Sequence, residues 1–308
     1  ELLHILGLHE TKSKKVKTIE RLPQAERNEG SLIENTIHTL QSNDILHQIE
    51  NPERFGENKE TQLFSIGLEL CIIWLNRILF LKLLESQLVK YHKTTNSTDY
   101  HFLNTSKIQD FEHLNELFFD VLAVQPNARS KSLQDKYAII PYLNSSLFEP
   151  HASEQEGLYI NQLKSHIRLP LFSGTVLKTS TGKAQSGNKP LLDYLFDFLD
   201  SYNFASDHKA EIQETPKSII NSAVLGLIFE KINGYKDGSH FTPGFITMYM
   251  SREILKKAVI NKFRNAQIEG FQSIESYTDL YNKIGNISIK KANEVINSIK
   301  ICDPAVGS

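Results

Sequence analysis

The feature that most constrains the fold is a long apolar run, Leu63–Leu84, which is interrupted by Glu69, Asn76, Arg77 and Lys82. A run of this length could cross a bilayer, but charged side chains at such positions are costly in lipid. We therefore expect a buried helix of a soluble protein, from about Gln62 to His92, and no membrane span. Apolar residues lie on nearly every side of this helix, which is typical of the central helix of a domain.

The bulk composition sets limits on partners and location. A chain of 308 residues, 40% of them hydrophobic, can form one large or two medium domains. Its net charge of −2 gives no general attraction to a phosphate backbone, so any contact with nucleic acid must be a local patch. Cys71 and Cys302 are too few for a disulfide framework and are expected to be packing residues in a reducing cytosol. The absence of an initiator Met and of a targeting segment predicts a fragment of a cytoplasmic protein.

The remaining periodicity is mainly helical. The charged stretch from Lys12 to Arg27 is expected to be an exposed connector. Ser31 and Glu34 have capping-box spacing and predict a helix to about Leu46. Further helices are predicted over 108–124, 190–199 with Pro190 in the first turn, 218–232, 242–263, and 273–299 with a break near Gly285. Residues 139–186 predict loops and a small hairpin, and 300–303 predict the one core strand. The fold is expected to be mainly α.

The last segment, Asp303-Pro304-Ala305-Val306-Gly307-Ser308, is a turn after an expected strand, with an acid at the strand's end. Such a turn suits a ligand at the carboxyl end of a parallel sheet, because glycine lets the backbone approach the ligand closely. An ordinary Asp-Pro turn followed by Gly-Ser would have the same composition. Taken alone, the segment leaves both interpretations open.

A second segment, Gly238-Ser239-His240-Phe241-Thr242-Pro243, lies about sixty residues upstream and opens a predicted helix. The pair resembles adenine-specific DNA methyltransferases, in which an aromatic-Thr-Pro element precedes a strand ending in Asp-Pro-Ala-x-Gly-Ser-Gly. The resemblance implies that S-adenosylmethionine is bound by Phe241, Thr242, Pro243, Asp303, Pro304, Ala305, Gly307 and Ser308.

Four more segments extend the likeness to the Eco57I-like, type IIG restriction-modification enzymes: residues 30–37, 76–85, 140–149 and 225–231. The third of these, Ile140-Pro141-Tyr142-Leu143-Asn144-Ser145-Ser146-Leu147-Phe148-Glu149, is similar to a Pro-Tyr-Leu-Asn-Gly-Gly-Leu-Phe-Glu signature. Ser145-Ser146 replaces the usual glycine pair, which puts the backbone geometry in doubt. His240-Phe241 replaces the commoner Phe-Tyr, which puts the aromatic edge offered to the cofactor in doubt.

This resemblance implies a helical connector domain over residues 1–215 and, over 216–308, the helical start and first strand of a truncated Rossmann-like α/β methyltransferase domain. The parent enzyme is expected to methylate adenine N6 in a defined sequence of double-stranded DNA, with the base flipped. The catalytic Asn/Asp-Pro-Pro-Tyr/Phe loop is absent, since no two prolines are adjacent, so the fragment has no catalytic residue of its own. A non-enzymatic helical interaction module and a phage-defence methylase without a nuclease remain alternatives.

A nuclease fused to the parent would need Mg²⁺, held by a Pro-Asp followed by Asp/Glu-x-Lys. Glu10-Thr11-Lys12 and Glu57-Asn58-Lys59 match only the second half and are interpreted as surface charge, so such a domain is expected before Glu1. The eleven histidines have no zinc-ligand spacing, and no metal site is expected. The basic cluster of Lys12, Lys14, Lys15 and Lys17 either contacts phosphate or solvates a linker.

Overall fold

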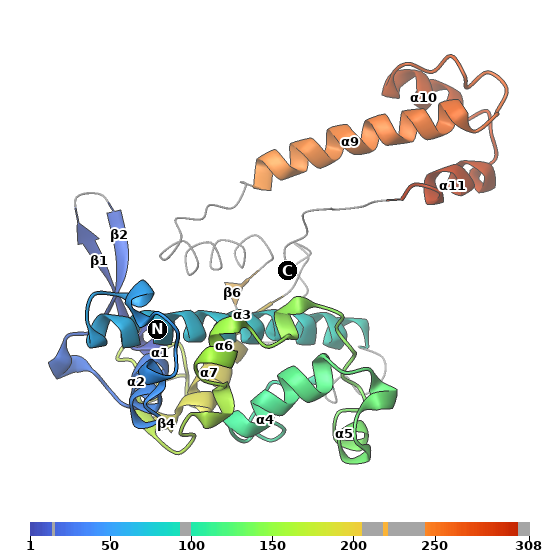
Figure 1. The fold of residues 1–308 in the computed structure, drawn as a ribbon. Helices are drawn as coiled ribbons and strands as arrows, with labels where there is room; N and C mark the ends of the chain where they lie inside the picture. Colours follow the sequence, from blue (N-terminus) through green and yellow to red (C-terminus); the bar gives the residue numbers. More distant parts are fainter. Residues whose placement is uncertain (14–15, 93–99, 205–217, 221–243, 301–308) are drawn as a thin grey trace. The chain divides into compact units, whose positions relative to one another are not determined.

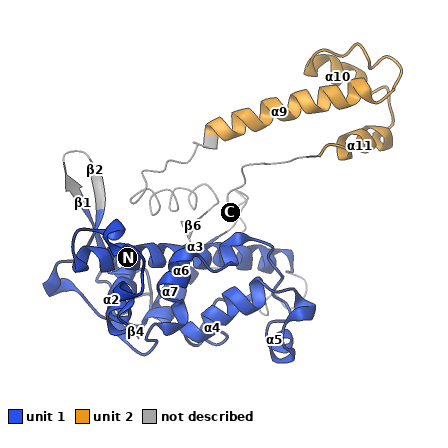
Figure 2. Cartoon of the chain, viewed as in Figure 1, with its two compact units in different colours: residues 1–239 blue, residues 240–308 orange. Residues whose placement is uncertain are grey.

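The computed structural model describes residues 1–13, 16–92, 100–204, 218–220 and 244–300. The chain separates into two units, residues 1–239 and residues 240–308 (Figure 2). In the described residues both units are mainly helical, as the sequence predicts, and the strands are short. The predicted domain boundary at 215/216 lies outside the described residues.

The central helix of unit 1, α3, runs from Lys59 to Tyr91 (Figure 1). It begins in a capping box in which the Asn58 side chain accepts from Thr61 N at 3.0 Å and Asn58 N donates to Thr61 Oγ1 at 3.2 Å. By length and composition this helix could cross a membrane. Its buried side chains include the charged Arg77, Lys82 and Glu85, all of which have partners in the core. The prediction of a buried central helix is confirmed.

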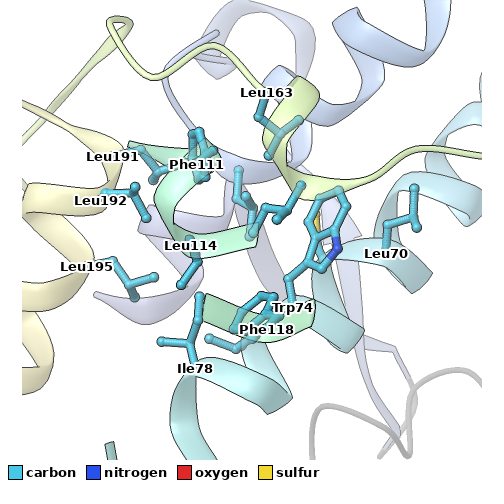
Figure 3. Packing of buried hydrophobic residues seen from close by; sticks show 14 of the residues in the cluster. Leu70, Trp74, Ile78, Phe111, Leu114, Phe118, Leu163, Leu191, Leu192 and Leu195 are labelled. Carbon is cyan, nitrogen blue, oxygen red and sulfur yellow. The ribbon is translucent and has the colours of Figure 1, made fainter. Parts of the chain in front are cut away.

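The core of unit 1 forms where three helical segments meet α3 (Figure 3). Helix α4 (Phe111–Glu116) continues without a break into the π-helical turns of η5 (Leu117–Leu122), so the predicted 108–124 helix is present. Helix α7 (Leu191–Asp200) is present as predicted, but Pro190 is its N-cap, with φ −55° and ψ 148°, and not a residue of its first turn. Their contacting side chains are apolar and almost fully buried: Leu70, Trp74, Ile78, Phe111, Leu114, Phe118, Leu191, Leu192 and Leu195.

Helix α2 (Leu32–Ser42) starts at Ser31 as predicted, but the capping box is wrong. The Ser31 hydroxyl donates to Asn28 O at 2.8 Å instead of capping. The Glu34 carboxylate turns to Arg21, whose Nε and Nη2 each donate to it at 2.7 Å. A two-point bond to a guanidinium is stronger than a bond to a backbone amide, which explains the exchange.

The predicted connector is wrong over residues 12–13 and 16–21, because these residues belong to two paired antiparallel strands. Strand β1 (Leu8–Ser13) pairs with β2 (Val16–Arg21), with Leu8 opposite Arg21 and Ser13 opposite Val16. The stretch is rich in charge but contains β-branched residues at Thr11, Val16, Thr18 and Ile19, which favour an extended backbone. Leu8 is buried and Ile19 is packed against the core, so the base of the hairpin belongs to unit 1.

Short elements make up the rest of unit 1. Strand β3 (Arg168–Pro170) pairs with β4 (Asn188–Pro190) in an antiparallel pair, and β5 (Tyr202–Asn203) pairs in parallel with β6 (Ser218–Ile219). The helix expected from Ser218 therefore does not start there, and its remainder lies outside the described residues. The remaining helices and helical turns are α1 (Leu2–Leu6), η1 (Gln24–Glu26), η2 (Ile45–His47), η3 (Pro52–Phe55), η6 (Pro126–Ala128), α5 (Lys131–Lys136), η7 (Ser146–Phe148), α6 (Ala152–Glu156) and η8 (Ile160–Gln162).

Unit 2 contains three described helices, α9 (Gly244–Asn265), α10 (Tyr277–Ile284) and α11 (Ile289–Asn297). Their small core consists of Phe263, Phe271, Ile274, Leu280 and Val295. Gly285 follows α10 directly, which confirms the predicted break. The expected strand at 300–303 has only Lys300 among the described residues, and the Rossmann-like sheet stays a prediction.

Candidate functional site

The residues predicted to bind the cofactor all lie outside the described residues. Phe241, Thr242 and Pro243 precede α9, and Asp303, Pro304, Ala305, Gly307 and Ser308 follow α11 in the sequence. Helix α9 begins at Gly244, directly after the predicted Thr-Pro start, and ends two residues beyond the predicted Phe263. Because the cap itself is outside the described residues, the arrangement of the cofactor residues stays a prediction.

Two segments that carry the family resemblance meet at a buried arginine. Arg77, in α3, donates from Nε to Leu147 O at 2.6 Å and from Nη2 to Glu149 O at 2.9 Å. The same guanidinium makes a two-point salt bridge to Glu154 in α6, with Nη1–Oε1 at 2.6 Å and Nη2–Oε2 at 2.8 Å. The arginine of the 76–85 segment thus holds the backbone of the 140–149 segment.

The Glu154 carboxylate accepts from two more donors besides the two Arg77 nitrogens. Trp74 Nε1 donates to Oε1 at 2.8 Å, and His151 N donates to Oε2 at 2.9 Å, which closes a capping box at the start of α6. The Arg77 guanidinium also lies over the rings of Phe118 and Phe119, 5.4 and 5.0 Å from their centroids. A buried ion pair is tolerated when its remaining hydrogen-bonding groups are satisfied, and that condition is met here. The junction is closed to solvent, so it fixes structure and has no access to a substrate.

The backbone at Ser145-Ser146, where serines replace the usual glycine pair, has a conformation that serine adopts readily. Ser145 is extended, with φ −141° and ψ 131°, and its Oγ accepts from Leu147 N at 3.3 Å. Neither serine has a positive φ. The serine pair therefore fits this turn without the conformational freedom of glycine.

A second charged cluster joins α3 to the end of α7. Lys82 donates to Glu85 and to Asp200, while Glu85 Oε1 accepts from Leu103 N at 2.9 Å. Burial, the largest effect, lowers the pKa of Lys82, but the two carboxylates together outweigh it and leave the pKa raised. Lys82 is therefore charged at neutral pH, and its bonds to Glu85 and Asp200 hold the end of α7 against α3.

The partial nuclease matches have structural roles that the sequence did not indicate. Glu10-Thr11-Lys12 lies in β1, where Thr11 Oγ1 donates to Glu20 Oε1 at 2.9 Å. Asn58 of the other match caps α3. Within the part of the chain that the structure describes, no three His, Cys, Asp or Glu side chains are grouped as metal ligands. The basic residues Lys14 and Lys15 lie outside that part.

Comparison with known proteins relates the chain to restriction-modification enzymes. A protein of Methanocaldococcus jannaschii, named as a candidate type II restriction enzyme and methyltransferase, is 23% identical over 259 residues. The match covers 78% of this chain and 20% of that protein, so the chain spans about a fifth of the length of this relative. No solved structure matches the chain. A family model matches residues 1–220, and the chain therefore belongs to the family described as Domain of unknown function (DUF7814).

Proposed function

We propose that the chain is the helical scaffold and the first part of the methyltransferase domain of a restriction-modification enzyme. In this proposal the parent enzyme is Eco57I-like and of type IIG, and it transfers a methyl group from S-adenosylmethionine to adenine N6 in double-stranded DNA. The observation that carries it is the similarity, over 78% of the chain, to a protein named as a restriction enzyme and methyltransferase. The order of the Phe241-Thr242-Pro243 and Asp303–Ser308 segments supports the adenine specificity.

Unit 1 suits the role of a scaffold because buried polar contacts tie its elements together. Arg77 joins α3 to residues 147–154, and Lys82 joins α3 to α7. Arg21 joins β2 to α2 through Glu34 and reaches Glu60 of α3 at 3.3 Å. Each contact needs a specific geometry on both sides, so together they favour one arrangement of the elements.

Unit 2 suits the start of a larger domain, because one long helix presents apolar side chains that its own unit leaves uncovered. Phe245, Met248, Tyr249, Ile254 and Leu255 of α9 are 43–75% exposed. An exposed apolar surface of this kind is typical of a surface that packs against another element. We assign it to the sheet of the methyltransferase domain, whose cofactor-binding residues here are Phe241, Thr242, Pro243, Asp303, Pro304, Ala305, Gly307 and Ser308.

The test uses the complete gene product with tritiated S-adenosylmethionine and duplex DNA. We expect tritium in the DNA, and mass spectrometry of the nucleosides should identify N6-methyladenine. Asp303→Ala should abolish transfer, whereas the matched surface variant Asp135→Ala, in exposed α5, should retain it. A methylated cytosine as the product would overturn the adenine specificity, and no transfer at all would overturn the function.

The nuclease part of the proposal has a separate readout. Cleavage of unmethylated duplex DNA by the complete protein should require Mg²⁺, supplied to a domain outside this chain. Methylation without cleavage would instead support a phage-defence methylase. The 308-residue chain itself holds only part of the proposed cofactor site, so calorimetry should detect weak binding of S-adenosylmethionine or none. Micromolar binding would contradict this expectation.

A further inference from the structure

Unit 1 contains a long segment of one charge sign. Between Glu156 and Asp193 the sequence has no acidic residue, although at the chain's average of 36 in 308 a segment of this length would hold about four. The same segment, called here the acid-free segment (residues 157–192), carries Lys164, His166, Arg168, Lys178, Lys183 and Lys189. In a chain of net charge −2, this is a local excess of positive charge along the sequence, which a polyanion would require.

The cations of the acid-free segment differ in how far they are already neutralised. Lys189 pairs with Asp197, and Arg168 and Lys189 are close enough to Asp193 to act on its pKa. By contrast, no carboxylate of the described chain forms an ion pair with Lys178 or Lys183, and both side chains are exposed. Lys164 is likewise exposed and its side chain contacts His38 and no carboxylate among the described residues, but only Lys178 and Lys183 lie together in one turn.

Both lysines belong to one turn, called here the basic turn (residues 177–185). Thr179 N donates to Lys183 O at 2.8 Å, Gly182 N to Thr179 O at 2.9 Å, and Gln185 N to Leu177 O at 2.9 Å. Gly182 has φ +80°, a left-handed conformation that glycine adopts without strain. The turn is therefore folded by its own backbone, and little order has to be gained on binding.

The base of the basic turn is fixed to the core of unit 1. Thr175 Oγ1 and Val176 N donate to the two carboxylate oxygens of Glu1, at 2.5 and 2.8 Å. Leu177 is buried. These contacts direct the Glu1 carboxylate inward, where it holds the base, and they leave Lys178 and Lys183 on a rigid support.

The chemistry of the exposed side chains selects the partner. From Ser173 to Asn188 the exposed residues are small, hydroxylic, amide or basic, and they include no aromatic or large aliphatic side chain. The neighbouring Phe172 is 38% exposed, but its ring packs beside the His4 ring, with the centroids 5.5 Å apart. An interface with protein would need an apolar centre, and single-stranded nucleic acid would need aromatic rings for stacking. Lysines, hydroxyls and backbone amides are the groups that contact the phosphates of duplex DNA without reading its sequence.

We propose that the basic turn contacts the phosphate backbone of duplex DNA through Lys178 and Lys183. The inference rests on the proposed function, because that function makes duplex DNA the partner of the parent enzyme. The contact contributes affinity and register, and the recognition of bases belongs elsewhere in the enzyme. The plot of log K against log salt has a negative slope, and the loss of each phosphate contact reduces the magnitude of that slope by about 0.9.

The test is fluorescence anisotropy of the 308-residue chain with a labelled 30-base-pair duplex, across a series of salt concentrations. Lys178→Glu/Lys183→Glu should weaken binding at least about tenfold at 100 mM salt and reduce the slope by about two. The control Lys59→Glu/Lys131→Glu makes the same change in net charge at exposed first-turn positions of α3 and α5, and it should bind as the unaltered chain does.

Equal binding by both double variants would overturn the inference, as would an unaltered chain that prefers duplex RNA to duplex DNA. The methylation assay keeps the two proposals apart. If the complete protein methylates DNA while Lys178→Glu/Lys183→Glu binds DNA normally, the proposed DNA contact of the basic turn is refuted and the proposed function is not. If the variant loses DNA binding while the complete protein transfers no methyl group, the DNA contact of the basic turn is supported and the proposed methyltransferase function is refuted.

Discussion

Arg77 in α3 and Glu154 in α6 form a two-point salt bridge inside unit 1, with side-chain exposures of 1% and 0%. The two residues are far apart in the sequence, and the bridge holds α6 against the central helix. The same carboxylate also accepts from Trp74, and the same guanidinium holds two backbone carbonyls. Removing either partner would therefore leave several buried polar groups without a bond.

We expect Arg77→Met to lower the free energy of unfolding by about 3–5 kcal/mol, because the Glu154 charge would stay buried and unpaired. Urea unfolding followed by circular dichroism measures the change. Arg77→Met/Glu154→Gln should recover part of the loss, since the second substitution removes that charge. The control is Arg54→Met, whose pair with Glu156 is 49% and 43% exposed and should contribute less than about 1 kcal/mol. Similar losses in the two single variants would contradict the importance of burial.

Gly30 predicts a second measurable effect, because its Cα lies against a strand. A Cβ at this position would be 2.5 Å from Arg168 O and 2.9 Å from Leu169 N, both of which are backbone atoms that cannot turn away. Gly30→Ala should therefore destabilise unit 1 by about 1–3 kcal/mol, as overpacking does. Gly285→Ala meets no atom within 4 Å and has φ −65°, so it should be neutral or slightly stabilising in the same thermal unfolding measurements. Equal stability of both variants would refute the steric argument.

The sequence predicted α3 well because a long apolar run that contains a few charged residues is compatible with few structures other than a buried helix. The capping box predicted for Glu34 was wrong because the Glu34 carboxylate binds Arg21 instead. Arg21 lies in a hairpin that the highly charged sequence of residues 12–27 did not indicate. It also singled out the segments around Arg77 and Glu149 separately. No periodicity indicates which carbonyls a buried guanidinium will reach, so their contact had to come from the structure. The proposed cofactor residues stay predictions for a different reason, because they lie outside the described residues.

Cys71 should not react with alkylating reagents in the folded chain. Burial raises the pKa of its thiol to about 12, against a smaller lowering by the hydrogen bond with Thr36. At pH 8 roughly one thiol in ten thousand would be ionised, and the thiolate is the reactive form. In a Cys302→Ser variant, iodoacetamide should leave Cys71 unlabelled under native conditions and label it in 6 M guanidinium, as mass spectrometry would show. Rapid labelling of the native variant would mean that the α2–α3 contact opens readily.

Tyr194 predicts how unit 1 responds to alkali. Burial, followed by the nearby Glu1, raises the pKa of its phenol to about 12, although the bond from Phe172 N at 2.9 Å acts in the opposite direction. The hydroxyl donates to Glu1 Oε1 at 2.8 Å, and this bond requires the neutral phenol. A folded pKa above the ordinary value of about 10 means that the stabilisation is complete below pH 10 and is lost as the pH rises through about 12.

Tyr194→Phe should therefore reduce the stability of unit 1 most at neutral pH, and the difference from the unaltered chain should shrink between pH 10 and pH 12. Chemical unfolding at a series of pH values gives the difference, and absorbance at 295 nm follows the ionisation of the phenol. Tyr142→Phe serves as the control, because Tyr142 Oη donates to the exposed Asn144 side chain, at 3.1 Å. A constant difference between Tyr194→Phe and the unaltered chain across this range would show that the phenol's ionisation is not linked to folding, and that the Glu1–Tyr194 bond acts independently of pH.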